Sequence, residues 1–326
     1  MIELSVIDSD RFRILRPLDR GGIGRVYLAY DEGLNREVAL KQLRRRYADD
    51  SQLRSRLLFE AEVTAGLEHP GVVPVYGLGQ YADGRPFFTM RLIRGDHLNS
   101  AIKHFHRTDQ PGGWLSGLCS LLDRLVDVCY TVAYAHSRGI IHRDLTPGNI
   151  MLGVHGETLV IDWGLAKPLG CPSPVDEGES SPAAPWPASA RDLAQTEVGQ
   201  NAGTPWFMSP EQVAGQPDWL SPATDVYTLG ATLYMILTGQ APFDGQEADE
   251  VRKLVQQGIL PPPRQLNRRI DPALEAICRK ATAMAPEDRY ASPLDLGDDI
   301  ACWLAKRPVT ARPTAASQDR VADPAI

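Results

Sequence analysis

The sequence predicts an α+β fold in two parts, a strand-rich part followed by a mostly helical one. From residue 12 to about residue 92 the chain consists of short strand-like stretches, interrupted by one segment with helical periodicity. Beyond Gly95 the apolar segments are long enough for helices. At 326 residues, the chain can form one large domain or two lobes with an ample core.

Five strands and one helix are expected in the first part. The strands are predicted at residues 15–18, 26–30, 38–41, 72–78 and 86–92. Between residues 51 and 67, apolar side chains recur at intervals of four, which predicts a helix. These side chains are Leu53, Leu57, Ala61 and Ala65. Together the elements form a sheet that carries one helix.

Two long apolar segments, residues 118–137 and 223–238, are predicted as the main helices of the second part. The second of them is hydrophobic on nearly every side, which is typical of a helix inside a domain. Weaker helices are expected at residues 247–257, 272–283 and 294–305.

Two further segments are expected to lack fixed structure. Residues 170–195 are crowded with Pro, Ser, Ala and acidic residues, and cannot bury enough apolar area to offset the entropy of ordering. We interpret them as a disordered regulatory insert. Residues 306–326, rich in Ala, Thr, Pro and Asp, are expected to form a loose C-terminal tail.

The charge balance argues against nucleic-acid binding. There are 34 basic and 41 acidic residues, so the net charge is −7. Nonspecific binding to nucleic acid needs a basic footprint instead. The one short basic run, Arg44-Arg45-Arg46, is interpreted as a solvated helix face.

Neither the N-terminus nor the cysteines indicate export. The first residues lack the basic and apolar regions of a signal peptide, and no run of about 18 apolar residues occurs. The five cysteines show neither metal-ligand spacing nor a disulfide framework, which favours reduced thiols. We therefore expect a soluble, cytoplasmic protein with no membrane span in this chain.

Polar residues in the middle of the chain point to phosphoryl transfer. Residues 142–149 read His-Arg-Asp-Leu-Thr-Pro-Gly-Asn, and Asp162 follows on the next hairpin. Asn149 and Asp162 offer the oxygen ligands that Mg²⁺ prefers, and Mn²⁺ can take the same ligands. Asp144 can then orient a hydroxyl nucleophile. A surface ion pair, the usual role of an isolated His-Arg-Asp, is disfavoured because apolar strands bracket the loop.

Residues of the first part supply candidate phosphate contacts. The turn with Gly21, Gly22 and Gly24 lets main-chain N–H groups approach phosphates, although any tight hairpin can hold three glycines. Lys41 ends a Val-Ala-Leu-Lys strand, where a surface lysine is the common alternative. Glu60 lies on the inward face of the predicted helix, so Lys41 is its expected partner.

This set of residues resembles the bacterial, eukaryotic-type (Hanks-type) serine/threonine protein kinases. The resemblance rests on Lys41, Glu60, residues 142–149, 162–164 and 203–211, and on Asp225 and Arg289, and it covers residues 12–305. It implies a bilobal fold with an N-lobe at residues 12–93 and a C-lobe at residues 94–305. It also implies ATP as phosphoryl donor, Ser or Thr hydroxyls of proteins as acceptors, and a homodimer suited to autophosphorylation.

The resemblance assigns roles to individual residues. Asp144 and Lys41 would be catalytic, and Asn149 and Asp162 would bind Mg²⁺. The nucleotide would contact Leu18, Val26, Ala39, Met90, Met151 and the main chain at Arg91 and Ile93. Several of these apolar residues are equally compatible with plain core.

The resemblance also suggests how the activity is regulated and which contacts hold the loop at residues 142–149 and the C-lobe. Arg143 suggests control by a phosphorylated loop, with Thr196 and Thr204 as candidate phosphosites. Glu211 and Arg289 are expected to form a buried ion pair. Asp225 is expected to anchor the main chain of the catalytic loop.

Three departures from the family pattern support an alternative, a pseudokinase that serves as a nucleotide-binding scaffold. Asp19 replaces a glycine of the loop, and Thr64 places a hydroxyl where an apolar residue is usual. Thr146 occupies the position of a lysine that reaches the γ-phosphate. Because the metal and base residues are retained, we expect an active but slow kinase instead. A small-molecule kinase is a third option, which the protein-docking segment at residues 203–211 disfavours.

Overall fold

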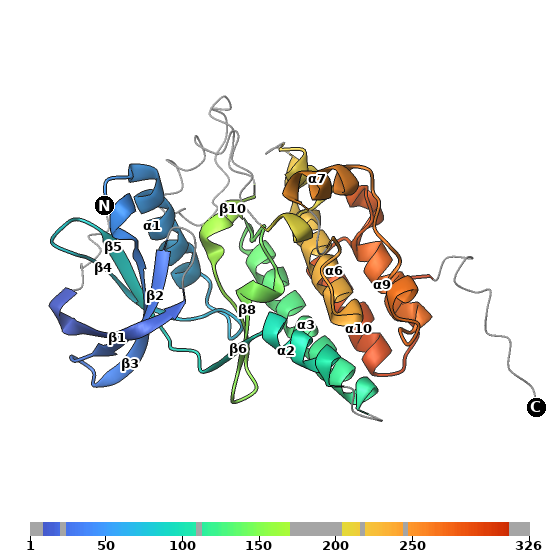
Figure 1. The fold of residues 1–326 in the computed structure, drawn as a ribbon, viewed down its shortest axis with the longest axis horizontal. Coiled ribbons are helices and arrows are strands. Elements are labelled where there is room, and N and C mark those ends of the chain that lie inside the picture. Colours follow the sequence, from blue (N-terminus) through green and yellow to red (C-terminus); the bar gives the residue numbers. More distant parts are fainter. Residues whose placement is uncertain are drawn as a thin grey trace, which may run out of the picture.

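The computed structural model describes residues 9–19, 24–108, 113–169, 204–215, 219–243 and 247–312. A β-sheet with one long helix occupies one end of the molecule, and a group of helices occupies the other (Figure 1). The α+β fold class and its division into two lobes are therefore confirmed. The insert at residues 170–195 lies outside the described residues.

The N-terminal lobe is built on the predicted five-stranded sheet, which is antiparallel with the order β1-β2-β3-β5-β4. Its strands are β1 (Phe12–Asp19), β2 (Gly24–Asp31), β3 (Arg36–Leu43), β4 (Val75–Gln80) and β5 (Pro86–Met90). Val26 pairs with Lys41, and Ala39 pairs with Met90. Since side chains alternate between the faces of a strand, Ala39 and Lys41 face the same side of the sheet.

The helix α1 (Ser51–Gly66) begins after Asp50, whose side chain accepts hydrogen bonds from the first turn. Leu57, Glu60 and Ala61 are buried as expected, but Ala65 is exposed, so the predicted stripe was wrong at its end. The reason is geometric. Four residues of an α-helix turn by about 400°, which is about 40° more than one full turn. Side chains spaced four apart therefore drift away from the buried face after a few steps.

Helices make up most of the C-terminal lobe. They are α2 (Leu98–Arg107), α3 (Trp114–Ser137), α5 (Pro210–Val213), α6 (Pro222–Thr238), α7 (Ala248–Gln256), α8 (Pro263–Leu266), α9 (Pro272–Ala281) and α10 (Pro293–Leu304). α6 is buried from Thr224 to Leu237, as its all-round hydrophobicity predicted. The prediction missed α2, whose Leu98 and Ile102 are both buried and lie four residues apart. No helix in the described part of the chain is both long and apolar enough to span a bilayer.

Two small sheets lie between the lobes and position the catalytic loop. β6 (Gly95–His97), β8 (Ile150–Gly153) and β9 (Thr158–Val160) form one, and β7 (Ile140–Ile141) pairs with β10 (Lys167–Pro168) in the other. Residues 142–149 connect β7 to β8, and Asp162 follows β9. The sheets therefore bring the two motifs of the phosphoryl-transfer hypothesis to one place.

The loose tail was predicted to begin too early. Asp299 of α10 accepts hydrogen bonds from the main-chain N–H groups of Thr310 and Ala311, at 2.6 and 3.0 Å, and Ala311 is only 4% exposed. A buried carboxylate needs donors, and this segment of the chain provides them. Residues 306–312 therefore belong to the ordered lobe. Residues 313–326 lie outside the described residues.

Candidate active site

A cavity of about 540 Å³ lies between the lobes and brings together most of the predicted site residues. The predicted residues that line it are Leu18, Gly24, Val26, Ala39, Lys41, Glu60, Met90, Arg91, Ile93, Asp144, Asn149, Met151 and Asp162. Gly21 and Gly22 of the glycine-rich turn, and the phosphosite candidate Thr196, lie outside the described residues. The structure thus places side chains from both lobes on one cavity.

Lys41 forms the centre of a charge cluster on the N-lobe side. Its Nζ lies 2.5 Å from Glu60 Oε1 and 3.3 Å from Asp162 Oδ1. The Lys41 and Glu60 side chains are only 13% and 7% exposed. Burial raises the pKa of Glu60 to about 7. Burial also favours a neutral amine, but the two carboxylates outweigh it and raise the pKa of Lys41, which keeps its charge.

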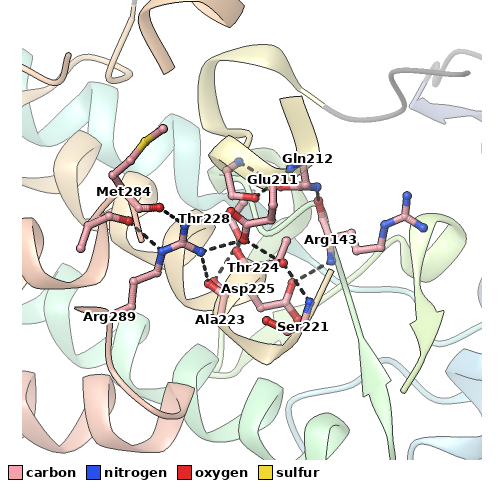
Figure 2. Close-up of polar contacts among 12 residues, drawn as sticks. Arg143, Glu211, Gln212, Ser221, Ala223, Thr224, Asp225, Thr228, Met284 and Arg289 are labelled. Atoms are coloured by element: carbon pink, nitrogen blue, oxygen red, sulfur yellow. Dashed lines mark hydrogen bonds and ion pairs between the residues drawn. The ribbon is translucent and has the colours of Figure 1, made fainter. Parts of the chain in front are cut away.

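Asp225 holds the catalytic loop from beneath. Its carboxylate accepts hydrogen bonds from the main-chain N–H groups of His142 and Arg143, at 2.8 and 2.7 Å, and lies 2.7 Å from His136 Nε2. Arg143 has a φ of 74°, in the left-handed region. In this turn the N–H of Arg143 and the N–H of His142 both reach the Asp225 carboxylate. Burial alone would raise the pKa of Asp225, but the contacts with His136 and the loop outweigh it and lower the pKa. The expected anchor is therefore confirmed (Figure 2).

Asp144 is held in a defined orientation inside the cavity. Asn149 Nδ2 donates to both the main-chain oxygen and Oδ2 of Asp144, each at 2.8 Å. The N–H of Thr204 donates to Asp144 Oδ1 at 3.2 Å. Burial raises the pKa of Asp144, which increases its basicity. A carboxylate held in this way can accept a proton from a neighbouring hydroxyl group.

The donor set beside Asp144 fits a divalent metal. Because Asn149 Nδ2 is used by Asp144, Oδ1 is the atom of that amide that remains for a cation. Asp162 adds a carboxylate, whose pKa is lowered mainly by Lys41. Within the described ranges, no group of three His, Cys, Asp or Glu side chains could hold a metal. Two protein oxygens supplemented by phosphate and water are usual for Mg²⁺.

Trp163 follows the candidate metal ligand and occupies a fully buried position. Its ring packs against His142, with the ring centroids 4.6 Å apart. His142 Nε2 lies 3.2 Å from the main-chain oxygen of Ile161. These contacts connect the loop that carries Asn149 to the segment that carries Asp162. The two candidate metal ligands are therefore held by the same packed residues.

Glu211 and Arg289 form the predicted buried ion pair. Two guanidinium nitrogens of Arg289 donate to the two carboxylate oxygens of Glu211, at 2.7 and 2.9 Å. Figure 2 shows this pair beside α6, where Thr224 also donates to Glu211. The sequence did not reveal the next contact: Gln212 Nε2 donates to the main-chain oxygen of Arg143 at 2.7 Å. This bond connects the segment that follows Glu211 directly to the loop at residues 142–149.

The structure places each departure from the family pattern. Asp19 lines the cavity. The Thr64 hydroxyl donates to the main-chain oxygen of Glu60 at 2.6 Å, so this buried polar group is satisfied within α1. Thr146 is only 6% exposed.

Arg56 also lines the cavity, and it was not among the predicted site residues. It lies one helical turn before Glu60, and its Nε donates to the main-chain oxygen of Gly164 at 3.0 Å. The signal was present, because residues four apart share a helix face and Glu60 was placed on the inward face. Arg56 joins α1 to the segment that carries Asp162.

Comparison with known proteins agrees with this geometry. Residues 12–296 match the family described as protein kinase domain. The chain belongs to this protein kinase family. It is similar to proteins named serine/threonine-protein kinase PknD: 35% identical to that of Protochlamydia amoebophila (strain UWE25) over 308 residues, and 36% identical to that of Chlamydia pneumoniae over 309. The one from Chlamydia felis (strain Fe/C-56) is 37% identical over 296 residues.

The three alignments cover different shares of the two chains. They include 92%, 92% and 89% of this chain, but only 30%, 32% and 30% of the three relatives. The chain therefore spans about a third of the length of the curated relatives that it matches. Their similarity concerns the kinase domain.

Proposed function

We propose that the chain is an active serine/threonine protein kinase, which transfers the γ-phosphoryl group of ATP to Ser or Thr hydroxyls of proteins. The observation that carries this proposal is the convergence of Lys41, Glu60, Asp144, Asn149 and Asp162 on one cavity. A scaffold that only bound nucleotide would need neither an oriented base nor two metal ligands. The family membership supports the same conclusion.

Binding of ATP would use both lobes. Val26 and Ala39 of the sheet and Met151 of the C-lobe line the cavity on its two sides, which suits a flat adenine between them. The main chain of Arg91 and Ile93 follows β5 and offers polar groups to the adenine edge. Arg91 N–H donates to the main-chain oxygen of Pro74 at 3.0 Å, which fixes this connection between the lobes.

Transfer would rest on position and charge. Lys41, oriented by Glu60, would contact the inner phosphates, and Mg²⁺ held by Asn149 and Asp162 would offset the charge of the phosphates when bound. Mn²⁺ would suit the same oxygens. Asp144 would orient the substrate hydroxyl and receive its proton as the new O–P bond forms and the bond to ADP breaks.

We further propose that the domain acts in the cytoplasm on other proteins and on copies of itself. Gln212, which follows the segment ending at Glu211, bonds to the main chain of Arg143 beside Asp144. The segment is therefore held next to the proposed base, where it could hold a protein acceptor. Autophosphorylation between copies would require at least a transient homodimer. Thr204 is a candidate phosphosite only after rearrangement, since its N–H now bonds to Asp144.

Intact-mass measurement after incubation with Mg²⁺ and ATP tests the proposal. We expect the wild-type protein to gain one or more phosphates and Asp144→Asn to gain none, because that variant lacks the base. Peptide mapping then shows whether Thr196 or Thr204 carries phosphate. If the wild type binds ATP but phosphorylates neither itself nor a generic protein substrate, the proposal is wrong and the scaffold hypothesis replaces it.

A further inference from the structure

A second concave region lies on the outer face of the N-lobe sheet. Its volume is about 550 Å³. Along β2, Gly24 and Val26 line the nucleotide cavity, whereas Arg25 and Tyr27 line this second one. This alternation is what a strand imposes, so the two cavities lie on opposite faces of the same sheet.

Positive charge is concentrated in this second cavity. Five arginines line it, namely Arg25, Arg44, Arg45, Arg46 and Arg85, and we call it the arginine cavity. None of its described lining residues is acidic, although the chain as a whole carries a net charge of −7. Arg45 and Arg46 are exposed on a short helical turn, as expected of a solvated helix face, but the run at residues 44–46 also lines this cavity. It forms part of a concave surface with two other elements.

Arg85 is built into the floor of the arginine cavity. Its side chain is 6% exposed, and its Nη1 donates to the main-chain oxygen of Leu43 at 3.2 Å. Nε donates to Asp83 at 2.8 Å, and the guanidinium lies 4.9 Å from the centroid of the Tyr81 ring. These contacts fix the side chain before any ligand arrives. The hydrogen bond from Arg85 lowers the pKa of Asp83, and the charge of Arg45 contributes, so Asp83 partly offsets the positive charge at this end of the cavity.

The rim is also partly ordered in advance. The Arg46 guanidinium lies over the Tyr47 ring, 4.6 Å from its centroid, within the short helical turn Arg45–Tyr47. Arg45 and Arg46 are exposed, and Arg44 is half-buried. A group of guanidinium planes that is held in place loses less side-chain entropy when it closes on an anion.

We propose that the arginine cavity binds a phosphorylated segment of a protein. Guanidinium groups match phosphate oxygens in pairs, and clusters of arginine are the usual means of recognising a phosphorylated side chain. The volume is in the range of ligand pockets and suits one phosphorylated residue with its neighbours. A nucleic acid would instead require a long basic stripe, and the net negative charge of the chain disfavours it.

The test measures binding by fluorescence anisotropy. The probes are fluorescein-labelled nonapeptides with a central phosphoserine and randomised flanks, compared with the same peptides carrying serine. Titrations are made without ATP at about 150 mM salt, where long-range attraction between exposed charges is largely screened. Because no catalysis is involved, the result is independent of the proposed kinase activity.

We expect the phosphopeptides to bind the wild-type protein at least about tenfold more tightly than the serine peptides. Arg45→Glu combined with Arg46→Glu should remove at least about tenfold of that affinity. The matched control, Arg268→Glu with Arg307→Glu, makes the same change in net charge at exposed positions outside this cavity and should change the affinity less than about twofold. Thermal unfolding of both double variants checks that the fold is retained.

Three results would overturn the proposal. The first is equal binding of phosphoserine and serine peptides. The second is an equal loss of affinity in both double variants, which would indicate attraction by net charge alone. The third is tighter binding, through Arg45 and Arg46, of inorganic phosphate, an RNA oligomer or phosphatidylserine vesicles than of the phosphopeptides. The ligand would then belong to one of those classes instead.

Discussion

On the C-lobe side of the cleft, the catalytic loop is fixed by buried hydrogen bonds, whereas on the N-lobe side Lys41 and Glu60 are fixed mainly by each other. The single carboxylate of Asp225 contacts two main-chain N–H groups of the loop and also His136. Lys41 and Glu60 lie on different elements, β3 and α1, so their 2.5 Å contact depends on how these elements sit. The position of Asp144 is therefore fixed in advance, whereas the position of Lys41 can be adjusted. We call the C-lobe side of the cleft the rigid side and the N-lobe side the adjustable side.

This difference explains where control of activity would act. Moving α1 slightly would separate Lys41 from Glu60 without disturbing Asp144. Arg56, which bonds from α1 to Gly164, and Lys41, which contacts Asp162, connect the adjustable side to the metal-binding segment. Shifts of α1 would thus reach the C-lobe through these polar contacts and through Phe59 and Val63, which share a buried hydrophobic cluster with Trp163.

Breaking the rigid side should have the largest effect, and Arg289→Met does so directly. Removing Arg289 leaves the carboxylate of Glu211 buried without its cation, which we expect to lower the free energy of unfolding by about 3–5 kcal/mol. Urea denaturation measures this. Arg268→Met, at an exposed arginine, should change it by less than about 0.5 kcal/mol. Glu211→Gln added to Arg289→Met should recover part of the loss, and no recovery would contradict the assignment.

Breaking the adjustable side should instead affect activity more than stability. Glu60→Gln keeps the shape of the side chain but removes the charge that orients Lys41. We expect kcat/KM to fall by about 10²-fold, comparable to the loss of one preorganised charge contact. Steady-state kinetics with a protein substrate measure this change.

Stability measurements complete the contrast between the two sides. Near pH 7, the free energy of unfolding of Glu60→Gln should change by less than about 1 kcal/mol, because a buried charge is lost together with its ion pair. A stability loss as large as that of Arg289→Met would show that the two sides are held alike.

Much of this arrangement could be predicted from the sequence, and the failures have physical causes. The ion pair Lys41–Glu60 could be predicted because a carboxylate on the inward face of a helix requires a partner, whereas Glu211–Arg289 followed only from the resemblance to the kinase family. The bond from Gln212 to the Arg143 main chain could not, since it involves a side-chain amide and a carbonyl group, which every residue carries. The arginine cavity was missed because Arg25 lies in β2, Arg44 directly after β3 and Arg85 directly before β5, so they meet only in the folded sheet.

Adding a charge to the rigid side should give a smaller, favourable effect. Thr146→Lys restores a cation two residues after Asp144, and we expect kcat to rise by roughly tenfold. The expected gain is smaller than the full value of a charge contact, because Thr146 is buried. A longer side chain there must displace its neighbours before its ammonium group can reach the cavity. Thr146→Met is the control of similar length without charge. An unchanged or lower rate in Thr146→Lys would contradict the prediction.

The smallest expected effect is a dependence on pH that belongs to the adjustable side alone. Burial raises the pKa of Glu60 to about 7, so raising the pH from 6 to 8 should ionise Glu60 and restore its pairing with Lys41. We expect kcat/KM to rise several-fold in this window, and the rise should be absent in Glu60→Gln. Its persistence in that variant would assign the titration to another group.

Stability should move in the opposite direction over the same range. The folded pKa of Glu60 lies above its unfolded value of about 4.5, so protonation is favoured by folding. Its contribution to stability is fully present below pH 4.5 and is lost as the pH rises through about 7. The free energy of unfolding of the wild type, measured relative to Glu60→Gln, should therefore fall between pH 5 and 8 while relative activity rises. Activity and stability would then be set against each other on the adjustable side of the cleft by a single carboxyl group.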